Sequence, residues 1–368
     1  MAMLSVRVLH PGEYDLWDRF VSTSAQGTLF HSSKWLRASG GDFRVYACFK
    51  GSELFGGLPV VRKSALLFTT ATRPMLTPYL GVVQRSSSAK YVSRLCAEKE
   101  VTRLLAHAVK ADFDSIFINF VPTTVDIQPF IWEGFSPGVR YTYLLRLDDL
   151  DAIWNSMDHD RRNNITSARN DGLEVERRDD FADLMRFVNT TFERQRMLVP
   201  FREVARSYVE TLRQSNQCQT FFVRNRDGQR VAAVHIVWDT KRSYYLLGGC
   251  DHRQGCGGAV VLALWDAITF TKKELGLPEF DFEGSMVPAI EKFFRLFGGT
   301  FTPYFSVQYV KPSVKVLQFL AGSKKLLVRG VRSGSAGLCA CLPGWMRGAA
   351  GVAAVKLAYE VEAAARRS

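Results

Sequence analysis

The sequence lacks the signatures of membrane-spanning, secreted and zinc-binding proteins. No uninterrupted run of about 18 apolar residues occurs, so no transmembrane helix is expected. The first residues contain no apolar core followed by a cleavage site, so no signal peptide is expected either. The seven cysteines form no CxxC pair, and no histidine lies near the pair Cys339-x-Cys341. We therefore predict no metal site and a reduced, cytoplasmic environment.

Acidic residues are also scarce relative to basic ones. The chain has 36 acids against 48 lysines and arginines, a formal net charge of +12. This excess favours an anionic partner, which could be nucleic acid, a phosphate-rich cofactor, a nucleotide-linked sugar or an acidic lipid surface. The hydrophobic fraction of 47% is that of a globular protein, and 368 residues suggest more than one core.

The chain contains an internal duplication. Residues 43–61 and 220–238 both read as strand, turn and strand. Further along, three pairs of similar segments share one offset of 163 residues, starting at Val101 and Leu264, Ile118 and Asp281, and Tyr141 and Tyr304. Each half then has the order strand–strand–strand–helix–strand–helix–strand. This order predicts an α/β fold of two duplicated units, each a mixed sheet covered by helices.

The duplication sets the expected domains. Residues 1–150 form the first and residues 151–320 the second. Residues 321–368 differ in composition, because small and basic residues dominate them. We interpret this segment as a basic tail with a terminal helix, which could hold the protein to an anionic inner membrane face.

Two acids lie among phenylalanines in residues 280–299, FDFEGSMVPAIEKFFRLFGG. Alternation along a strand places Phe280 and Phe282 on one face and Asp281 and Glu283 on the other. A carboxylate at the carboxyl end of a strand is well placed for a site in an α/β fold. Partial burial would raise its pKa toward the range of a general base. The alternative for either acid is a purely structural cap or ion pair.

A glycine-rich loop precedes this strand. In GGCDHRQGCGGAVVLALW it lies between a predicted strand and a predicted helix, where backbone N–H groups and the helix dipole favour a phosphate. The corresponding part of the first half, YLGVVQRSSSAKY, has fewer glycines, so only the second half is expected to hold a pyrophosphate. A plain turn is the alternative. The predicted donor-binding residues are Gln254, Gly255, Gly257, Gly258 and Ala259.

With these motifs, the chain resembles the FemAB-like double-GNAT acyltransferases, which are related to the Fem-type peptidoglycan aminoacyl transferases. The matching pieces are LFHSSKWL, RNNITSARNDGL, the glycine-rich loop and the segment 280–299. The second piece fits the pattern R-x-x-I-x-x-A-x-x-x-G, and the loop fits Q/R-x-x-G-x-G/A. The likeness covers about residues 5–312.

The resemblance implies direct transfer of an acyl group to a deprotonated amine, without a covalent enzyme intermediate. The donor would be an acyl-CoA or an aminoacyl-tRNA, with backbone N–H groups of the strand SYYLLGG holding the oxyanion. Glu283 is then the preferred base and Asp281 the second choice. Tyr304 or Tyr245 could protonate the leaving group, although packing in the sheet is an alternative for both.

One position departs from the Fem-type pattern. Those enzymes carry a lysine in F-K-x-x-F-G, whereas FFRLFG places Phe294 there. The long helical hairpin that some of them insert is missing as well. Acyl-CoA is therefore favoured over aminoacyl-tRNA as the donor.

Four further residues are candidates for acceptor binding. Trp35 could line the acceptor pocket or belong to the core. Arg194 and Arg196 could clamp a carboxylate or diphosphate, or lie on a solvated helix face. Arg162 could act in the same way or pair with Asp158. His235 is expected to be a core residue of a strand.

Two classes of function remain open. The first is an N-acyltransferase acting on the amine of a sugar, an amino acid or a cell-envelope precursor such as a nucleotide sugar. The second is a non-catalytic module that binds nucleic acid, tRNA included, or a membrane surface through its basic charge. Acids alternating along one strand beside a glycine loop favour the enzyme, located in the cytoplasm or at the inner membrane face.

Overall fold

The computed structural model describes residues 3–65, 68–85, 88–193, 198–251 and 258–314. The chain divides into two compact units. Within the described residues, unit 1 comprises the chain up to Arg37, Gly41–Val139 and Phe305–Val314, and unit 2 is built mainly from Arg140–Tyr304. The boundaries predicted at residues 150 and 320 stay predictions, and the tail 321–368 lies outside the described residues.

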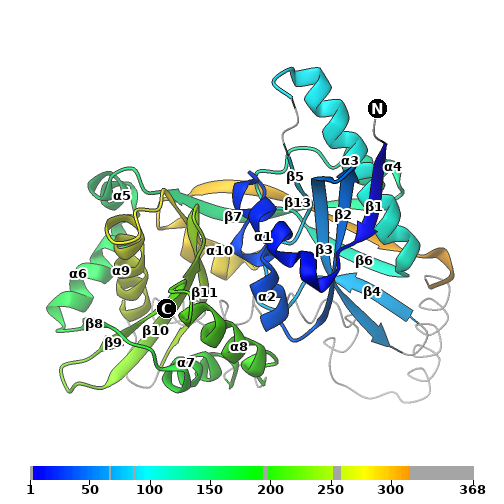
Figure 1. Cartoon of the computed structure of the whole chain (residues 1–368). Coiled ribbons are helices and arrows are strands. Elements are labelled where there is room, and N and C mark those ends of the chain that lie inside the picture. The colour runs from blue at the N-terminus through cyan, green and yellow to red at the C-terminus, as the bar shows by residue number, and fades with distance from the viewer. Residues whose placement is uncertain (1–2, 66–67, 86–87, 194–197, 252–257, 315–368) are drawn as a thin grey trace, which may run out of the picture. The chain divides into compact units, whose positions relative to one another are not determined.

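Unit 1 is a mixed sheet with helices, drawn mostly in blue and cyan (Figure 1). Its strands lie in the order β1-β2-β3-β4-β6-β13, and β5 pairs with β3. The strands are β1 (Leu4–Val8), β2 (Asp42–Lys50), β3 (Glu53–Ala65), β4 (Phe68–Thr72), β5 (Val83–Gln84), β6 (Ser115–Asn119) and the second half of β13 (Thr300–Val310). Its helices are α1 (Tyr14–Thr23), α2 (Ser33–Ala38), α3 (Tyr91–Asp112) and α4 (Gln128–Trp132), with short 3-10 turns at Pro11–Glu13 and Leu29–His31.

Unit 2 repeats this plan, in green and yellow (Figure 1). Its strand order is β7-β12-β11-β10-β9-β8. The strands are β7 (Ser136–Arg146), β8 (Glu174–Arg177), β9 (Cys218–Arg224), β10 (Arg230–Trp238), β11 (Arg242–Cys250) and β12 (Glu279–Asp281). The helices are α5 (Leu150–Ser156), α6 (His159–Asn170), α7 (Phe181–Glu193), α8 (Arg202–Arg213), α9 (Ala259–Lys273) and α10 (Pro288–Arg295).

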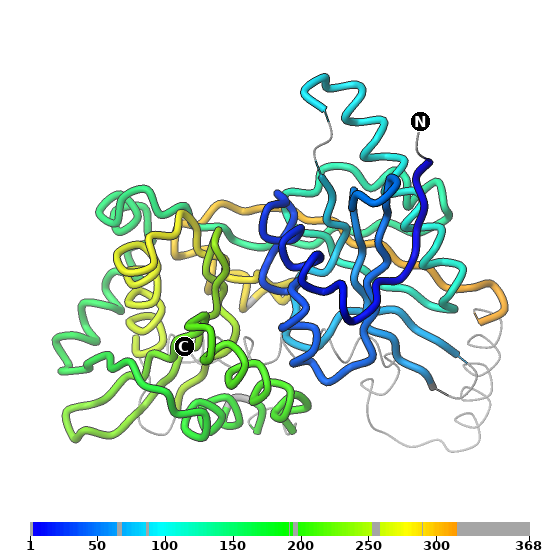
Figure 2. The backbone as a smooth tube through the Cα atoms, in the orientation of Figure 1, coloured from blue at the N-terminus to red at the C-terminus, as the bar shows by residue number. Residues whose placement is uncertain are grey.

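The predicted α/β class and the duplicated layout are confirmed. The order β2, β3, β4, α3, β6, α4, β7 in the first half recurs as β9, β10, β11, α9, β12, α10, β13 in the second. Among the described pairings, each unit has one parallel pair beside antiparallel ones, β4 with β6 and β11 with β12. A parallel pair requires a crossover, and α3 and α9 supply it, as the chain trace of Figure 2 lets the reader follow.

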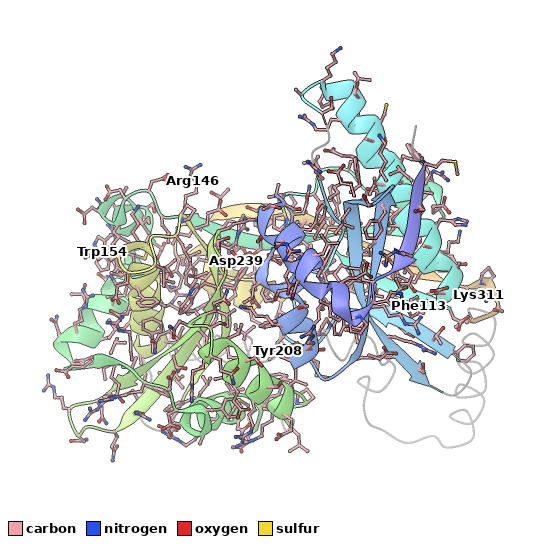
Figure 3. All side chains as sticks on the ribbon, in the orientation of Figure 1. Phe113, Arg146, Trp154, Tyr208, Asp239 and Lys311 are labelled. Atoms are coloured by element: carbon pink, nitrogen blue, oxygen red, sulfur yellow. The ribbon has the colours of Figure 1, made fainter. Side chains whose placement is uncertain are left out.

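Helix α9 carries the core of unit 2. It packs against β9, β10 and β11, and ten of its fifteen residues are buried. Its Trp265 lies 5.3 Å, between ring centroids, from Trp154 of α5, which is labelled in Figure 3. Helix α6 packs beside α9 and ends at Asn170, because Gly172 adopts a φ of +72° and Leu173 N–H donates to Ala168 C=O.

His235 is buried in the middle of β10, as its strand context predicts. Its Nδ1 lies 2.8 Å from Thr220 Oγ1 on the neighbouring strand. Burial, together with the charge of Arg213, lowers the pKa of the imidazole to about 3. His235 is therefore neutral in the folded protein at neutral pH.

This buried histidine should make the protein sensitive to acid. Its pKa is lower when folded than when unfolded, so its contribution is complete above about pH 6.5 and is lost as the pH falls toward 3. Relative to His235→Asn, the wild type should lose about 1.4 kcal/mol of unfolding free energy per pH unit in this window. Urea unfolding at a series of pH values measures this slope. His107→Gln, at a side chain 70% exposed, is the control for the loss of a histidine as such.

Candidate functional site

Strands β11 and β12 pair over a short stretch and then separate. Their parallel register covers only Arg242 with Glu279, Ser243 with Phe280 and Tyr244 with Asp281, whereas β11 runs on to Cys250. In the same strand a bulge places Leu246 as an extra residue opposite the junction of His235 and Ile236 on β10. Strand β12 instead continues toward β7, where Phe282 N–H donates to Tyr143 C=O. The carboxyl ends of two central strands therefore diverge.

Asp281 holds the turn that follows β12. Its side chain is fully buried, and its Oδ1 accepts both the hydroxyl of Thr142, at 2.7 Å, and the N–H of Glu283, at 2.8 Å. Its Oδ2 lies 3.8 Å from Nη1 of Arg242, which also pairs with Glu279 at 2.9 Å. This carboxylate thus connects β7, β11 and Glu283, the second residue after β12.

Glu283 lies at the point of divergence in an unusual conformation. Its φ is +56°, in the left-handed region that non-glycine residues rarely adopt, and the residue is only 5% exposed. Gly284 follows with a φ of +58°. A Cβ there would lie 2.1 Å from the carbonyl oxygen of Tyr141, so only glycine allows this turn to press against β7. Such strain in a buried acid at a strand end is typical of functional sites.

Tyr245 lies on β11 within the electrostatic reach of Glu283. Burial raises the pKa of its hydroxyl above the usual value, and the charges of Cys250 and Glu283 raise it further. The hydroxyl reaches over Gly248, where a Cβ would lie only 2.3 Å from it. The hydroxyl of Tyr245 is therefore protonated at neutral pH. Tyr245 lies on β11, the strand from which β12 diverges.

Tyr304, the other tyrosine predicted as a proton donor, is placed differently. It lies on β13 and is 5% exposed. Tyr244, the neighbour of Tyr245, is engaged elsewhere, because its hydroxyl donates to Asp239, labelled in Figure 3, at 2.7 Å. The charge of Glu283 contributes to the raised pKa of Tyr245. This electrostatic coupling between the two residues could not be predicted from the sequence.

Of the predicted phosphate loop, Gln254, Gly255 and Gly257 lie outside the described residues. Gly258 is the N-cap of α9 with a φ of +76°, and Ala259 is the buried first residue of the helix. A Cβ on Gly258 would lie 2.5 Å from the carbonyl oxygen of Asn164 and 3.2 Å from Ala168 Cβ, both on α6. This glycine therefore serves the close contact of α6 with α9.

The structure describes two of the four residues predicted to bind the acceptor, Trp35 and Arg162. The ring of Trp35 is fully buried in unit 1, its indole N–H donates to Thr77 Oγ1 at 2.9 Å, and it packs edge-on against Phe30. Arg162 is half-buried on the first turn of α6, next to Arg161, whose guanidinium lies 4.4 Å from the Phe293 ring centroid. Arg194 and Arg196 lie outside the described residues. All four roles stay predictions.

The equivalent position in unit 1 is filled by the chain itself. Strands β4 and β6 also part, after two register pairs, Thr70 with Ser115 and Ala71 with Ile116. There, however, Leu80 N–H donates to the carbonyl of Asn119, and the Asn119 amide donates to the carbonyl of Pro78, both at 2.9 Å. The segment leading to α3 thus occupies the edge of β6. The expectation that the second half carries the donor site stays a prediction.

Sequence reasoning missed Thr142 and Arg242 as supports of the two acids. Neither stands in a recognisable motif. The contact between Thr142 and Asp281 joins residues 139 positions apart. Only the pairing of β7 with β12 brings them together.

The described part of the chain contains no group of three or more His, Cys, Asp or Glu side chains placed to hold a metal ion. None of the helices described is both long enough and apolar enough to span a bilayer.

Comparison with known proteins agrees with this geometry. A model of the acetyltransferase (GNAT) domain family matches residues 159–295, which contain β11, α9, β12 and both acids. Residues 159–295 thus match an acetyltransferase (GNAT) domain, and the chain as a whole has the FemAB-like double-GNAT fold. The resemblance seen in the sequence is confirmed.

Solved structures show the same fold. The crystal structure of FemX is 16% identical with a TM-score of 0.63, over 81% of this chain and 96% of FemX. The C-terminal domain of a putative lysylphosphatidylglycerol synthetase from Agrobacterium fabrum is 11% identical with a TM-score of 0.51, over 81% and 92% of the two chains. L-PGS from Bacillus licheniformis is 12% identical with a TM-score of 0.51, over 85% and 96%. No match was found among curated proteins.

Proposed function

We propose that this protein transfers an acyl group from an activated carrier to an amine, with Glu283 as the general base. The observation that carries the proposal is the divergence of β11 and β12 with Glu283, held in a left-handed turn, at the point where they separate. A carrier arm with amide groups would pair with the edge of β11 that β12 leaves. The N–H groups of β11 near the bulge would then stabilise the oxyanion.

The two acids take different roles in this proposal. Asp281 accepts hydrogen bonds from Thr142 and from the N–H of Glu283 and lies near Arg242, so it positions the turn. Glu283 removes the proton from the attacking amine. Tyr245, whose pKa is raised, returns a proton to the leaving group, and Tyr304 is the second candidate for that step.

Acyl-CoA is the preferred donor. The start of α9, with Gly258, Ala259 and the preceding loop residues Gln254, Gly255 and Gly257, would receive its pyrophosphate. Phe294, at the position of the Fem-type lysine, is buried against Phe282 with ring centroids 5.2 Å apart. It therefore offers no charge to an acceptor phosphate.

Aminoacyl-tRNA is the second candidate donor. It is favoured by the fold shared with FemX and with a putative lysylphosphatidylglycerol synthetase, since a lysyl group on a lipid is an aminoacyl product. The acceptor we propose is an amine on a sugar, an amino acid or a cell-envelope precursor, contacted by Trp35, Arg162, Arg194 and Arg196. The reaction would take place in the cytoplasm, and the basic tail 321–368 would bring the protein to the inner membrane face.

The donor can be tested by thermal unfolding of the full chain with acetyl-CoA, free CoA or charged tRNA. At a ligand concentration about 100 times its Kd, binding to the folded state adds about 2.7 kcal/mol. For a protein of this size that corresponds to a rise in Tm of a few degrees. We expect acetyl-CoA and CoA to raise the Tm and charged tRNA to leave it unchanged. A rise with charged tRNA alone would select the second donor, and no rise with any of them would favour a binding module.

A further inference from the structure

Unit 1 contains a cleft with a mixed polar and apolar lining, independent of the Glu283 site. We call it the α3 cleft, and we propose that it binds an uncharged, polyhydroxylated ring, that is, a single sugar residue. It lies between α3, the β5 region and the segment that joins β6 to α4. Its lining residues are Gln26, Val82, Gln84, Leu95, Glu98, Lys99, Thr102, Phe120, Thr123, Thr124, Val125, Asp126 and Pro129.

Two glutamine side chains supply donors to the cleft. The Oε1 of Gln26 accepts the backbone N–H of Gln84 at 3.4 Å, and the Oε1 of Gln84 accepts the hydroxyl of Thr102 at 3.3 Å. Both amide oxygens therefore accept hydrogen bonds from within the protein. Within the described residues no hydrogen bond engages the two amide nitrogens, so each can donate to a ligand oxygen.

Acceptors lie across the same cleft. Glu98 is half-buried on α3, and its burial raises the pKa of the carboxyl, against the opposing effect of Arg94. The Oγ1 of Thr124 is buried and has no hydrogen-bond partner within the described chain. A buried hydroxyl without a partner is costly, and a ligand hydroxyl would satisfy it.

The charges in the cleft disfavour an anion. Lys99 is bound to Asp126 at 2.5 Å and to Gln128 at 2.7 Å, so its ammonium is already neutralised. Glu98 lies 3.9 Å from Nε of Arg94, so its charge is balanced as well, and the described lining offers no unpaired cation to a phosphate or carboxylate. The cleft thus differs in kind from the start of α9, where a phosphate is proposed.

Apolar atoms complete the fit to a sugar. Phe120, Val82, Leu95 and Pro129 line the cleft beside the polar groups. Each hydroxyl of a sugar both donates and accepts, and the C–H faces of its ring pack against apolar side chains. The alternation of amide donors, a carboxylate, hydroxyls and apolar surface in one cleft matches this chemistry.

The test uses saturation-transfer NMR on the full chain with three probes: methyl β-glucopyranoside, glucosamine and glucose 6-phosphate. The glucoside should receive saturation, and glucose 6-phosphate should bind more weakly. Glu98→Gln and Gln84→Leu should each weaken glucoside binding by about 10-fold, since each removes one ligand hydrogen bond. Glu100→Gln is the matched control, because Glu100 lies on the same helix, pairs with Arg103 and does not line the cleft.

Each outcome decides the matter, and thermal melts confirm that the variants fold. Absence of saturation transfer to the glucoside, or equal binding in the wild type and both cleft variants, overturns the proposal. Tighter binding of glucose 6-phosphate overturns it in favour of an anion site, and tighter binding of glucosamine alone in favour of an amine site. The result does not depend on the proposed acyl transfer, because the α3 cleft belongs to unit 1 and the experiment requires no turnover.

Discussion

Replacing Glu283 with glutamine should reduce acyl transfer by at least about 100-fold, the usual contribution of a positioned general base. Glutamine has nearly the same shape and suits the same turn, but its amide cannot take a proton from the attacking amine. Donor binding should persist, because the proposed contacts of the donor lie on β11 and at the start of α9. Release of the free carrier with a panel of amines measures the rate, and thermal shift with acetyl-CoA measures donor binding.

Two further variants make this result specific. Glu274→Gln removes a carboxylate about half exposed at the end of α9, paired with Arg177, and should leave the rate unchanged. Asp281→Asn keeps an oxygen that can accept from Thr142 and from the N–H of Glu283, so it should retain far more activity than Glu283→Gln. If Asp281→Asn were the inactive variant and Glu283→Gln the active one, the two roles would have to be exchanged.

The fold was predictable because both halves of the chain repeat one pattern. Apolar alternation and turn residues located the strands at 43–61 and 220–238 within a few residues of β2, β3, β9 and β10. The constant offset between the halves then indicated which elements correspond. These are local signals, and burial of one face of each strand enforces them.

The site was only partly predictable, because its geometry depends on contacts distant in sequence. Alternation along the strand singled out Asp281 and Glu283, but no local rule separates a positioning acid from a base. That distinction comes from Thr142, on the neighbouring strand β7, and from the positive φ of Glu283. In the same way, Gly258 was interpreted as part of a phosphate loop. Its contact with Asn164 on α6 adds a packing role that spacing alone does not reveal.

Replacing Gly284 with alanine should destabilise unit 2 by about 3 kcal/mol or more, among the largest effects of a single added methyl group. The new Cβ would lie 2.1 Å from the carbonyl oxygen of Tyr141 and 2.5 Å from Thr142 Cα. Both are backbone atoms of β7, which also pairs with β12 at Leu144–Arg146, so they cannot move aside without breaking that pairing. The left-handed φ of +58° adds a further cost for any residue with a Cβ.

Gly276→Ala is the matched control, because it separates the backbone cost from the steric one. Gly276 has a similar φ of +65°, but no atom lies within 4 Å of its added Cβ. Its substitution should cost only about 1 kcal/mol, through the left-handed conformation alone. Urea unfolding followed by fluorescence gives both values. Because the turn at Gly284 also carries Glu283, the alanine variant should lose transfer activity even where enough folded protein remains to bind acetyl-CoA. Equal destabilisation by the two variants would show that β7 does not press on the turn, and the proposed placement of Glu283 would lose its structural basis.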